Sequence, residues 1–356
     1  MKVEVAVDIV KRALENPVST WLDYTPKNIP MAIYDDDEFV FINHPNPPSE
    51  RPDNLMAATA IDINGALTAT IPLAACDDEQ ELIALVYHEC FHVYQGQRFQ
   101  YNEEYHFFEI MAFYPELNPA YRALCSAETD ILNDDTLSPQ EKVEILSYLT
   151  HKRRQILAQH DGLLDFEKNL ERTEALASFV DQKAKQQRFN IVPDNSRCLY
   201  SYARQYFVGA AICWLFEQTY SSEEWQTLVE GGKSLSELLL QNRPHETDLP
   251  DLDLENRENL EKQTVEQVLA ETNQKIQTLL DNGAMTIKIP RSPDISRSFS
   301  PSSLVSLGDG RLLHSEIIII QTPKGQIFVE DELAFEDYMN GTVTFPARPY
   351  KLEGDK

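Results

Sequence analysis

The stretch from Glu81 to Gln95 constrains the fold of this chain more than any other. Apolar side chains occupy almost the whole circumference of the helix that this stretch predicts. Such a helix is expected inside a domain, covered on all sides. It nevertheless carries His88, Glu89 and His92, and buried polar groups cost free energy unless they have partners. The rest of the fold must therefore supply partners for three titratable side chains in its interior.

The spacing of these three side chains suits a metal ion. His88 and His92 are four residues apart, so on a helix they lie one above the other and can aim two imidazole nitrogens at one point. Neutral imidazoles are common ligands of zinc, and a carboxylate such as Glu89 that stays off the metal can accept a proton from water. The competing interpretation is a buried helix whose two histidines are hydrogen-bonded to other side chains.

The run His88-Glu89-Cys90-Phe91-His92 matches the HExxH signature, and here the sequence resembles the zincin metallopeptidases. The extended pattern with a third histidine is absent, because Arg98 stands at that position. The resemblance is therefore to the gluzincin type, in which a glutamate from a later helix completes the site. It extends loosely over residues 79–240 of this chain, where four further features recur in the same order as in uncharacterised zincin-like bacterial proteins. These are Tyr114-Pro115, Leu124 with Glu128, Glu174-Ala175-Leu176-Ala177, and Tyr206 with Gly209.

The third metal ligand that this resemblance implies is Glu174. Residues 171–179 resemble the E-(G/A)-x-A segment that many bacterial HExxH proteins carry downstream; Ala175 stands where such segments often have glycine, and both are small. Helical geometry alone does not decide between Glu174 and Glu171. Either Glu171 or Asp181 could instead hold the second N–H of a ligand histidine. The remaining candidate ligands are His106, Glu109 and Glu128.

The activity that the resemblance implies is zinc-dependent hydrolysis of peptide bonds. Zn2+ would activate a water molecule, and Glu89 would act as general base and then pass the proton to the leaving amine. The negative charge that develops on the carbonyl oxygen needs a further donor. Tyr206 is the first candidate, because Gly209 one turn later permits close packing, but most aromatic residues on an apolar helix belong to the core. Arg204 and Tyr202 are the other candidates.

The formal net charge of -27 argues against binding to a nucleic-acid backbone or to an anionic membrane surface.

The five cysteines are odd in number, widely spread and without a C-x-x-C pair, which favours a reducing compartment. Cys90 lies on the far side of its helix from the histidines, so we interpret it as a packing residue. With no predicted signal peptide or membrane span, we expect a cytoplasmic protein whose partner is a peptide or protein substrate. The sequence leaves the oligomeric state open.

The fold that these patterns predict is α+β and mainly helical. Short strands are expected at 31–34 and 38–42, and a hairpin at 58–72 turns at Asn64-Gly65, a dipeptide that tolerates positive φ. These strands form a small, mainly antiparallel sheet before the His88 helix. In zincins an edge strand pairs with extended substrate, so the hairpin is a candidate for that role, and a plain structural hairpin is the alternative. Helices are expected over residues 3–14, 103–161 with interruptions, 163–185, 201–219 and 254–280.

The composition changes after Gly283. Residues 287–303 are rich in Ser, Pro and Arg and are interpreted as a linker or exposed loop, and strands are expected at 317–321 and 326–329. The predicted organisation is a zincin-like metallopeptidase domain over 1–283 and a β-rich C-terminal subdomain or appendage over 284–356.

Two other interpretations of the whole chain stay open. One is a zincin-fold protein that no longer cleaves peptides and acts as a binding or regulatory module. The presence of Glu89 argues against it, because loss of that carboxylate is the simplest route to inactivity. The other is a structural helical protein in which HExxH occurs by chance.

Overall fold

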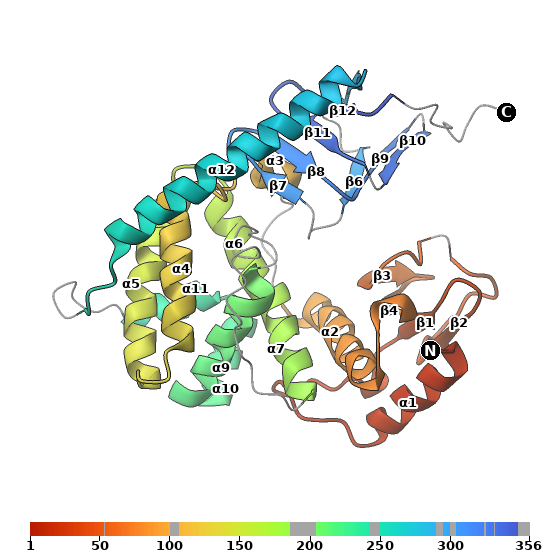
Figure 1. Ribbon diagram of the computed structural model, residues 1–356. Helices are drawn as coiled ribbons and strands as arrows, with labels where there is room; N and C mark the ends of the chain where they lie inside the picture. Colours follow the sequence, from red (N-terminus) through yellow and green to blue (C-terminus); the bar gives the residue numbers. More distant parts are fainter. Residues whose placement is uncertain are drawn as a thin grey trace.

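The α+β architecture is evident in a computed structural model of the chain (Figure 1). An N-terminal sheet lies beside helices α1 and α2, the centre of the chain is helical, and the C-terminal part is rich in strands. The fold class predicted from the sequence is therefore confirmed at this level. The structure describes residues 1–52, 54–99, 107–185, 204–242, 249–289, 295–299, 304–323, 325–330 and 332–347.

The N-terminal sheet confirms the strands and the hairpin expected from the sequence. Its strands follow the order β2-β1-β4-β3, with β1 and β4 parallel and the other neighbours antiparallel. The hairpin turns at Asn64 and Gly65, whose φ angles of 49° and 82° suit a type I′ turn. The elements of this part are α1 (Val3–Glu15), β1 (Met31–Tyr34), β2 (Phe39–Ile42), β3 (Thr59–Ile63) and β4 (Ala66–Pro72).

Helix α2 (Glu79–Arg98) lies in the interior, as its apolar circumference predicts. Its first turn is capped by the carboxylate of Asp78, which accepts hydrogen bonds from two backbone N–H groups. Aromatic residues from distant segments close around Phe91, with the Trp21 ring centroid at 5.4 Å and the Tyr24 ring centroid at 5.1 Å. The sheet, α1 and α7 share one apolar core with α2.

The helical centre differs from the sequence prediction at one functionally important place. A single helix over 163–185 is wrong: the chain forms α6 (Leu163–Arg172) and α7 (Glu174–Ala184), with a break at Thr173. The ψ angle of Thr173 is -79°, well outside the usual helical value. The other central elements are α3 (Phe107–Ala112), α4 (Pro119–Asn133), α5 (Pro139–Leu157), the π-helix η4 (Gln205–Gly209), α9 (Ala210–Thr219), α10 (Ser222–Glu230), α11 (Leu235–Leu239) and α12 (Leu254–Asp281).

A buried ion-pair network joins four of these helical segments. The Glu128 carboxylate on α4 accepts hydrogen bonds from Nε of Arg153 on α5, at 3.1 Å, and from the guanidinium of Arg204, just before η4. Arg153 also pairs with Glu167 on α6. All four side chains are buried, so each charge depends on its partner, and the network fixes the relative positions of the segments.

The C-terminal strands form two antiparallel sheets, in the orders β5-β12-β11-β8-β7 and β10-β9-β6. The prediction of a linker over 287–303 is wrong at two places. Residues 287–288 are the end of β5 and pair with β12. Residues 296–299 form β6, because Phe299 pairs with Ile318 and Arg297 binds Glu336. The strands are β5 (Met285–Lys288), β6 (Ser296–Phe299), β7 (Leu304–Ser306), β8 (Arg311–His314), β9 (Ile317–Thr322), β10 (Gly325–Glu330), β11 (Ala334–Asp337) and β12 (Thr342–Phe345).

The β7–β8 corner packs directly on the helical centre. The Gly310 N–H donates to the Ala112 carbonyl at 2.9 Å, and the Ser306 N–H donates to a carboxylate oxygen of Glu116 at 2.9 Å. Leu304 and Leu312 belong to the same apolar cluster as side chains of α3, α4 and α6. The domain boundary at 283 stays a prediction, but these strands share a core with the helices before it.

The contact between Glu116 and Ser306 predicts a pH-dependent stability. Burial raises the pKa of Glu116 to about 8, although the Ser306 N–H and the charge of Arg122 lower it. The same carboxyl group has an ordinary pKa of 4.5 in the unfolded chain. Between pH 4.5 and about 8, folding is therefore accompanied by proton uptake at Glu116, and the contribution of this group to the free energy of unfolding falls as the pH rises. We therefore expect Glu116→Gln to gain stability relative to wild type by roughly 1 kcal/mol per pH unit within this range. Urea unfolding between pH 5.5 and 8 measures this difference.

Glu141→Gln is the control, because hydrogen bonds from Ser138 lower the pKa of Glu141 below this range. Its difference from wild type should be constant between pH 5.5 and 8. A constant difference for Glu116→Gln as well would contradict the assignment of a raised pKa.

Candidate metal centre

Three side chains predicted as metal ligands meet between α2 and α7. The Nε2 atoms of His88 and His92 lie 3.7 Å and 3.6 Å from the same carboxylate oxygen, Oε2 of Glu174. One ligand atom from each residue lies within 4.8 Å of the others, and within the described part of the chain only this group of His, Cys, Asp and Glu residues meets that criterion. Ligand atoms on a tetrahedral zinc ion are separated by about 3.3 Å, given bonds of about 2.0–2.1 Å. The arrangement is therefore close to what a single ion requires.

The other candidate ligands do not join this group. Glu171 accepts a hydrogen bond from the Ser236 N–H at 2.9 Å, and Glu128 is held by Arg153 and Arg204. His106 lies outside the described residues, as does the side chain of Glu109.

Helix α7 presents Glu174 from its first turn, which also carries the small residues Ala175 and Ala177. Ala175 and Ala177 are completely buried, and α2 and α7 make the most extensive contact of the described helix pairs. Glu174 is the first residue of α7, where the positive end of the helix dipole stabilises a carboxylate. The close packing of α2 and α7 that the sequence predicted is thus present, while Ala175 lies against Gly209 of η4.

The second nitrogen of each histidine has an oxygen partner. Nδ1 of His88 lies 3.0 Å from Oδ2 of Asp181, and Nδ1 of His92 lies 2.8 Å from Oε1 of Gln95. Both oxygens accept, so each Nδ1 carries a hydrogen, and in the neutral imidazoles each Nε2 has a lone pair available to a metal ion. Asp181 is one of the two residues that the sequence offered for this role. Gln95 was missed, although it follows His92 by one helical turn.

The charges around the site favour a cation between these side chains. Burial lowers the pKa of His88, but its hydrogen bonds with Asp181 and Glu174 outweigh burial and hold the pKa well above its ordinary value. The pKa of His92 is raised in the same way by Glu174. Burial raises the pKa of Glu174, yet the two imidazoles bring it well below the ordinary value. The negative charge of the carboxylates stabilises protonated histidines, and a divalent ion bound between these side chains would balance the same charge. Protons and metal would therefore compete for the histidine nitrogens.

Glu89 lies in the same interior with an exposed fraction of 4%. Its Oε2 atom is buried and has no hydrogen-bond partner among the residues that the structure describes. Burial raises the pKa of Glu89, whereas interactions with His88 and His92 lower it. A carboxylate oxygen left without a donor beside three ligand groups fits a site built to hold a cation and a water molecule.

Tyr206 lies beside the cluster on η4. Its ring stacks parallel to the His88 ring, with centroids 5.9 Å apart. Gly209 at the end of η4 touches α7 so closely that a Cβ atom there would overlap the Cβ of Ala175. Of the other predicted donors, Arg204 binds Glu128 and Tyr202 lies outside the described residues.

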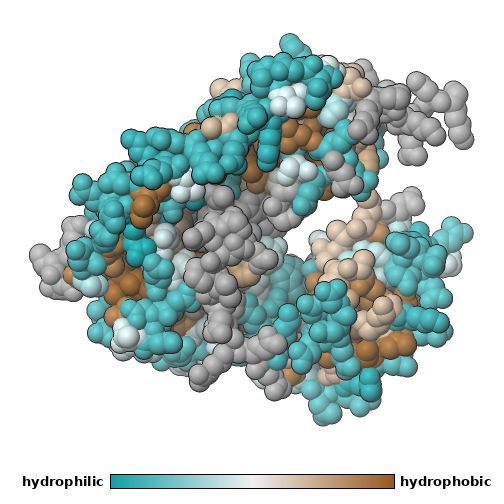
Figure 2. Space-filling model, viewed as in Figure 1, coloured by the Kyte–Doolittle hydropathy of each residue, from teal (hydrophilic) through white to brown (hydrophobic). Residues whose placement is uncertain are grey.

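Figure 2 shows a recess between the C-terminal strands and the β3–β4 hairpin. Strand β3 is an edge strand of its sheet, as a substrate-pairing strand must be, and that role stays a prediction. Cys90 is buried and is not part of the metal cluster, in agreement with a packing role.

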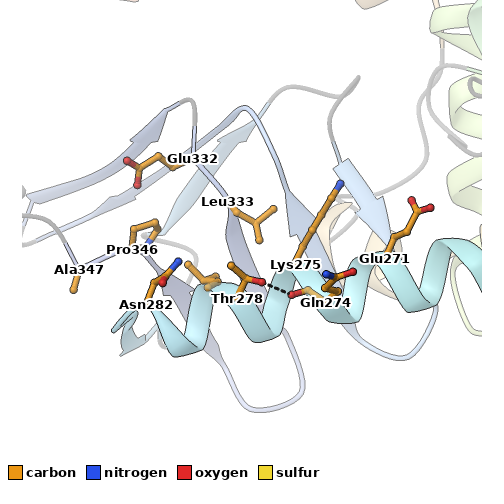
Figure 3. A pocket seen from close by; sticks show the side chains of 10 residues that line it. Glu271, Gln274, Lys275, Thr278, Asn282, Glu332, Leu333, Pro346 and Ala347 are labelled. Atoms are coloured by element: carbon orange, nitrogen blue, oxygen red, sulfur yellow. Dashed lines mark hydrogen bonds between the residues drawn. The ribbon is translucent and has the colours of Figure 1, made fainter.

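A separate groove of about 820 Å³ lies between α12 and the C-terminal strands (Figure 3). Its lining contains none of the residues of the metal cluster, and its polar groups belong mostly to α12. The lining residues are Glu271, Gln274, Lys275, Thr278, Leu279, Asn282, Glu332, Leu333, Pro346 and Ala347.

Comparisons of this chain with protein-family models, curated proteins and solved structures found no match. None of the described helices is long and apolar enough to span a membrane. The geometry of the candidate metal centre is therefore the main indication of function.

The contact between Gly209 and Ala175 yields a testable prediction. Gly209→Ala forces η4 away from α7, and we expect a loss of about 1–3 kcal/mol in the free energy of unfolding. Gly96→Ala on α2 is the matched control, because its Cβ would meet only the end of the flexible Leu67 side chain. Alanine is the better helix former, so this control should be neutral or stabilising by up to about 1 kcal/mol. Urea denaturation compares the two variants, and equal stability would contradict the proposed close contact.

Proposed function

We propose that this chain is a zinc-dependent peptidase with a zincin-like catalytic site of the gluzincin type. The observation that carries the proposal is the convergence of Nε2 of His88, Nε2 of His92 and Oε2 of Glu174. The proposal is further supported by Asp181 and Gln95, which orient the two imidazoles, and by the buried carboxylate of Glu89. A peptide or protein is the substrate in this proposal.

In the proposed site, Zn2+ held by His88, His92 and Glu174 would supply a Lewis acid that polarises the substrate carbonyl and activates water. Glu89 accepts the proton of the attacking water and delivers it to the leaving amine. Its burial suits both steps, since a raised pKa brings a carboxylate closer to the pH at which it must bind and release a proton. Tyr206, beside His88, is the candidate donor to the negative charge on the substrate oxygen.

We also propose a reducing compartment, such as the cytoplasm, for this protein. Of the described cysteines, Cys76, Cys90 and Cys213 are buried and form no disulfide. Free buried thiols are typical of proteins that are kept reduced.

The general-base role of Glu89 is tested by Glu89→Gln. We expect about one zinc ion per chain in both wild type and variant, because Glu89 is not a ligand in this proposal. Cleavage of a mixed peptide library should fall by about 10²–10⁴-fold in the variant, the usual contribution of a general base. Elemental analysis measures the zinc, and mass spectrometry of the peptides measures cleavage. Glu79→Gln, at an exposed position at the start of the same helix, should leave both unchanged.

Two outcomes would contradict the proposed peptidase function. Equal cleavage by wild type and Glu89→Gln would show that the activity does not depend on this carboxylate. Zinc uptake without cleavage by either protein would favour the metal-binding protein that does not cleave.

The role of Glu174 as third ligand is tested by Glu174→Gln. An amide is a much poorer zinc ligand than a carboxylate, and zinc affinity should fall by about 100-fold or more, beyond the usual loss for an outer-shell residue. Competition with a chromophoric chelator measures the affinity. Glu171→Gln is the matched comparison, because the same change is made where the carboxylate accepts from Ser236 instead. Loss of zinc in Glu171→Gln alone would transfer the assignment to Glu171.

A further inference from the structure

The buried side chain of Gln95 makes three polar contacts that join two distant parts of the chain. The side chain is 1% exposed. Its Oε1 atom lies 2.8 Å from Nδ1 of His92. Its Nε2 atom donates to the carbonyl oxygens of Arg172 and Thr173, at 2.9 Å and 3.1 Å. Every polar atom of this amide is therefore engaged.

The two carbonyls determine which way the amide faces. A carbonyl oxygen only accepts, so the NH2 group of Gln95 must point to Arg172 and Thr173. Its oxygen then faces His92, and the hydrogen of that imidazole must lie on Nδ1. In the neutral, metal-binding form of His92 the lone pair is consequently on Nε2, which lies 3.6 Å from Oε2 of Glu174.

The same two carbonyls belong to the break between α6 and α7. Arg172 is the last residue of α6, whose final carbonyls lack partners within that helix, and Gln95 supplies a donor there. The Thr173 carbonyl accepts from Gln95 and also from the Ala177 N–H of α7, at 3.1 Å. Glu174 is the next residue after Thr173 and opens α7. The position of the Gln95 amide therefore bears on where α7 begins and where the Glu174 side chain starts.

We propose that Gln95 is a positioning residue that sets two metal ligands at once: the tautomer and orientation of His92, and the placement of Glu174 through the α6–α7 break. The inference rests on the proposed metal site. A side chain that only accepted a hydrogen bond from His92 would not fulfil this role. The NH2 group of Gln95 is also needed, because it donates to the carbonyls of Arg172 and Thr173.

The partner of the other histidine shows how this can be tested. Asp181 accepts from His88, and a carboxylate is sufficient there. A carboxylate at position 95 would still accept from His92, but it would face the two carbonyl oxygens without a hydrogen to donate. Gln95→Glu thus keeps one half of the proposed role and removes the other. Gln95→Met removes both halves at similar volume.

Titration with Co2+ alone separates these possibilities, since its absorption spectrum reports ligand geometry independently of activity. We expect Gln95→Glu and Gln95→Met to bind Co2+ about 10–100-fold more weakly than wild type, the usual cost of losing an outer-shell partner. Both variants should show an altered Co2+ spectrum. Gln97→Glu makes the same chemical change at an exposed position on the same helix and should bind within about twofold of wild type.

Each outcome bears on the proposal. Wild-type affinity in Gln95→Glu overturns the role of the donor half, and wild-type affinity in both variants overturns any positioning role. If the wild type binds neither Co2+ nor Zn2+, both the proposed function and the inference are overturned. If the wild type binds metal tightly and Gln95→Glu and Gln95→Met bind it equally well, only the inference is overturned. If the variants do not fold, a crystal structure of zinc-loaded wild type decides: Gln95 turned away from His92 or from the two carbonyls overturns the inference.

Discussion

The structure depends on the close packing of α7 against α2. Helix α2 is buried on nearly every side, so the polar groups of His88, Glu89 and His92 need partners from other buried parts of the fold. Glu174, the first residue of α7, reaches both imidazoles of α2, and Gln95, one turn beyond His92, holds the backbone from which Glu174 starts. The apolar contact and the polar cluster are two consequences of the same interface.

The buried ion pairs form the second support of this interface. Desolvating Glu128, Arg153 and Glu167 costs free energy that hydrophobic side chains of similar volume would not. The charged side chains instead fix the relative positions of α4, α5, α6 and the residue before η4, because the network has a member on each of them. Helix α6 continues into the break at Thr173, and Arg204 precedes Tyr206 by two residues. Two of the segments that border the metal cluster are thus attached to one rigid network.

The features predicted correctly from the sequence are those set by short-range rules. The turn at Asn64-Gly65 follows from positive φ, and the burial of α2 from its apolar circumference. The convergence of His88 and His92 follows from helical spacing, and the small residues after Glu174 indicated a close helix contact. The break at Thr173 was missed because the segment around it has an uninterrupted helical pattern, and the donor at this junction comes from Gln95, far away in the sequence. Strand β6 was missed for a similar reason: its Ser- and Arg-rich sequence is typical of loops, and only pairing with β9 makes it a strand.

The two histidine partners differ in charge, and this difference has a consequence for the proposed metal site. A carboxylate on Nδ1 strengthens the imidazole as a donor, so Asp181 makes His88 the more basic ligand. The neutral amide of Gln95 orients His92 without adding a further negative charge. Glu174, Asp181 and Glu89 already place three carboxyl groups around the two imidazoles, and each additional anion would reduce the ability of the metal to polarise a substrate carbonyl. An amide at position 95 therefore provides the hydrogen bonds that assemble the site while preserving the positive charge on which the proposed chemistry depends.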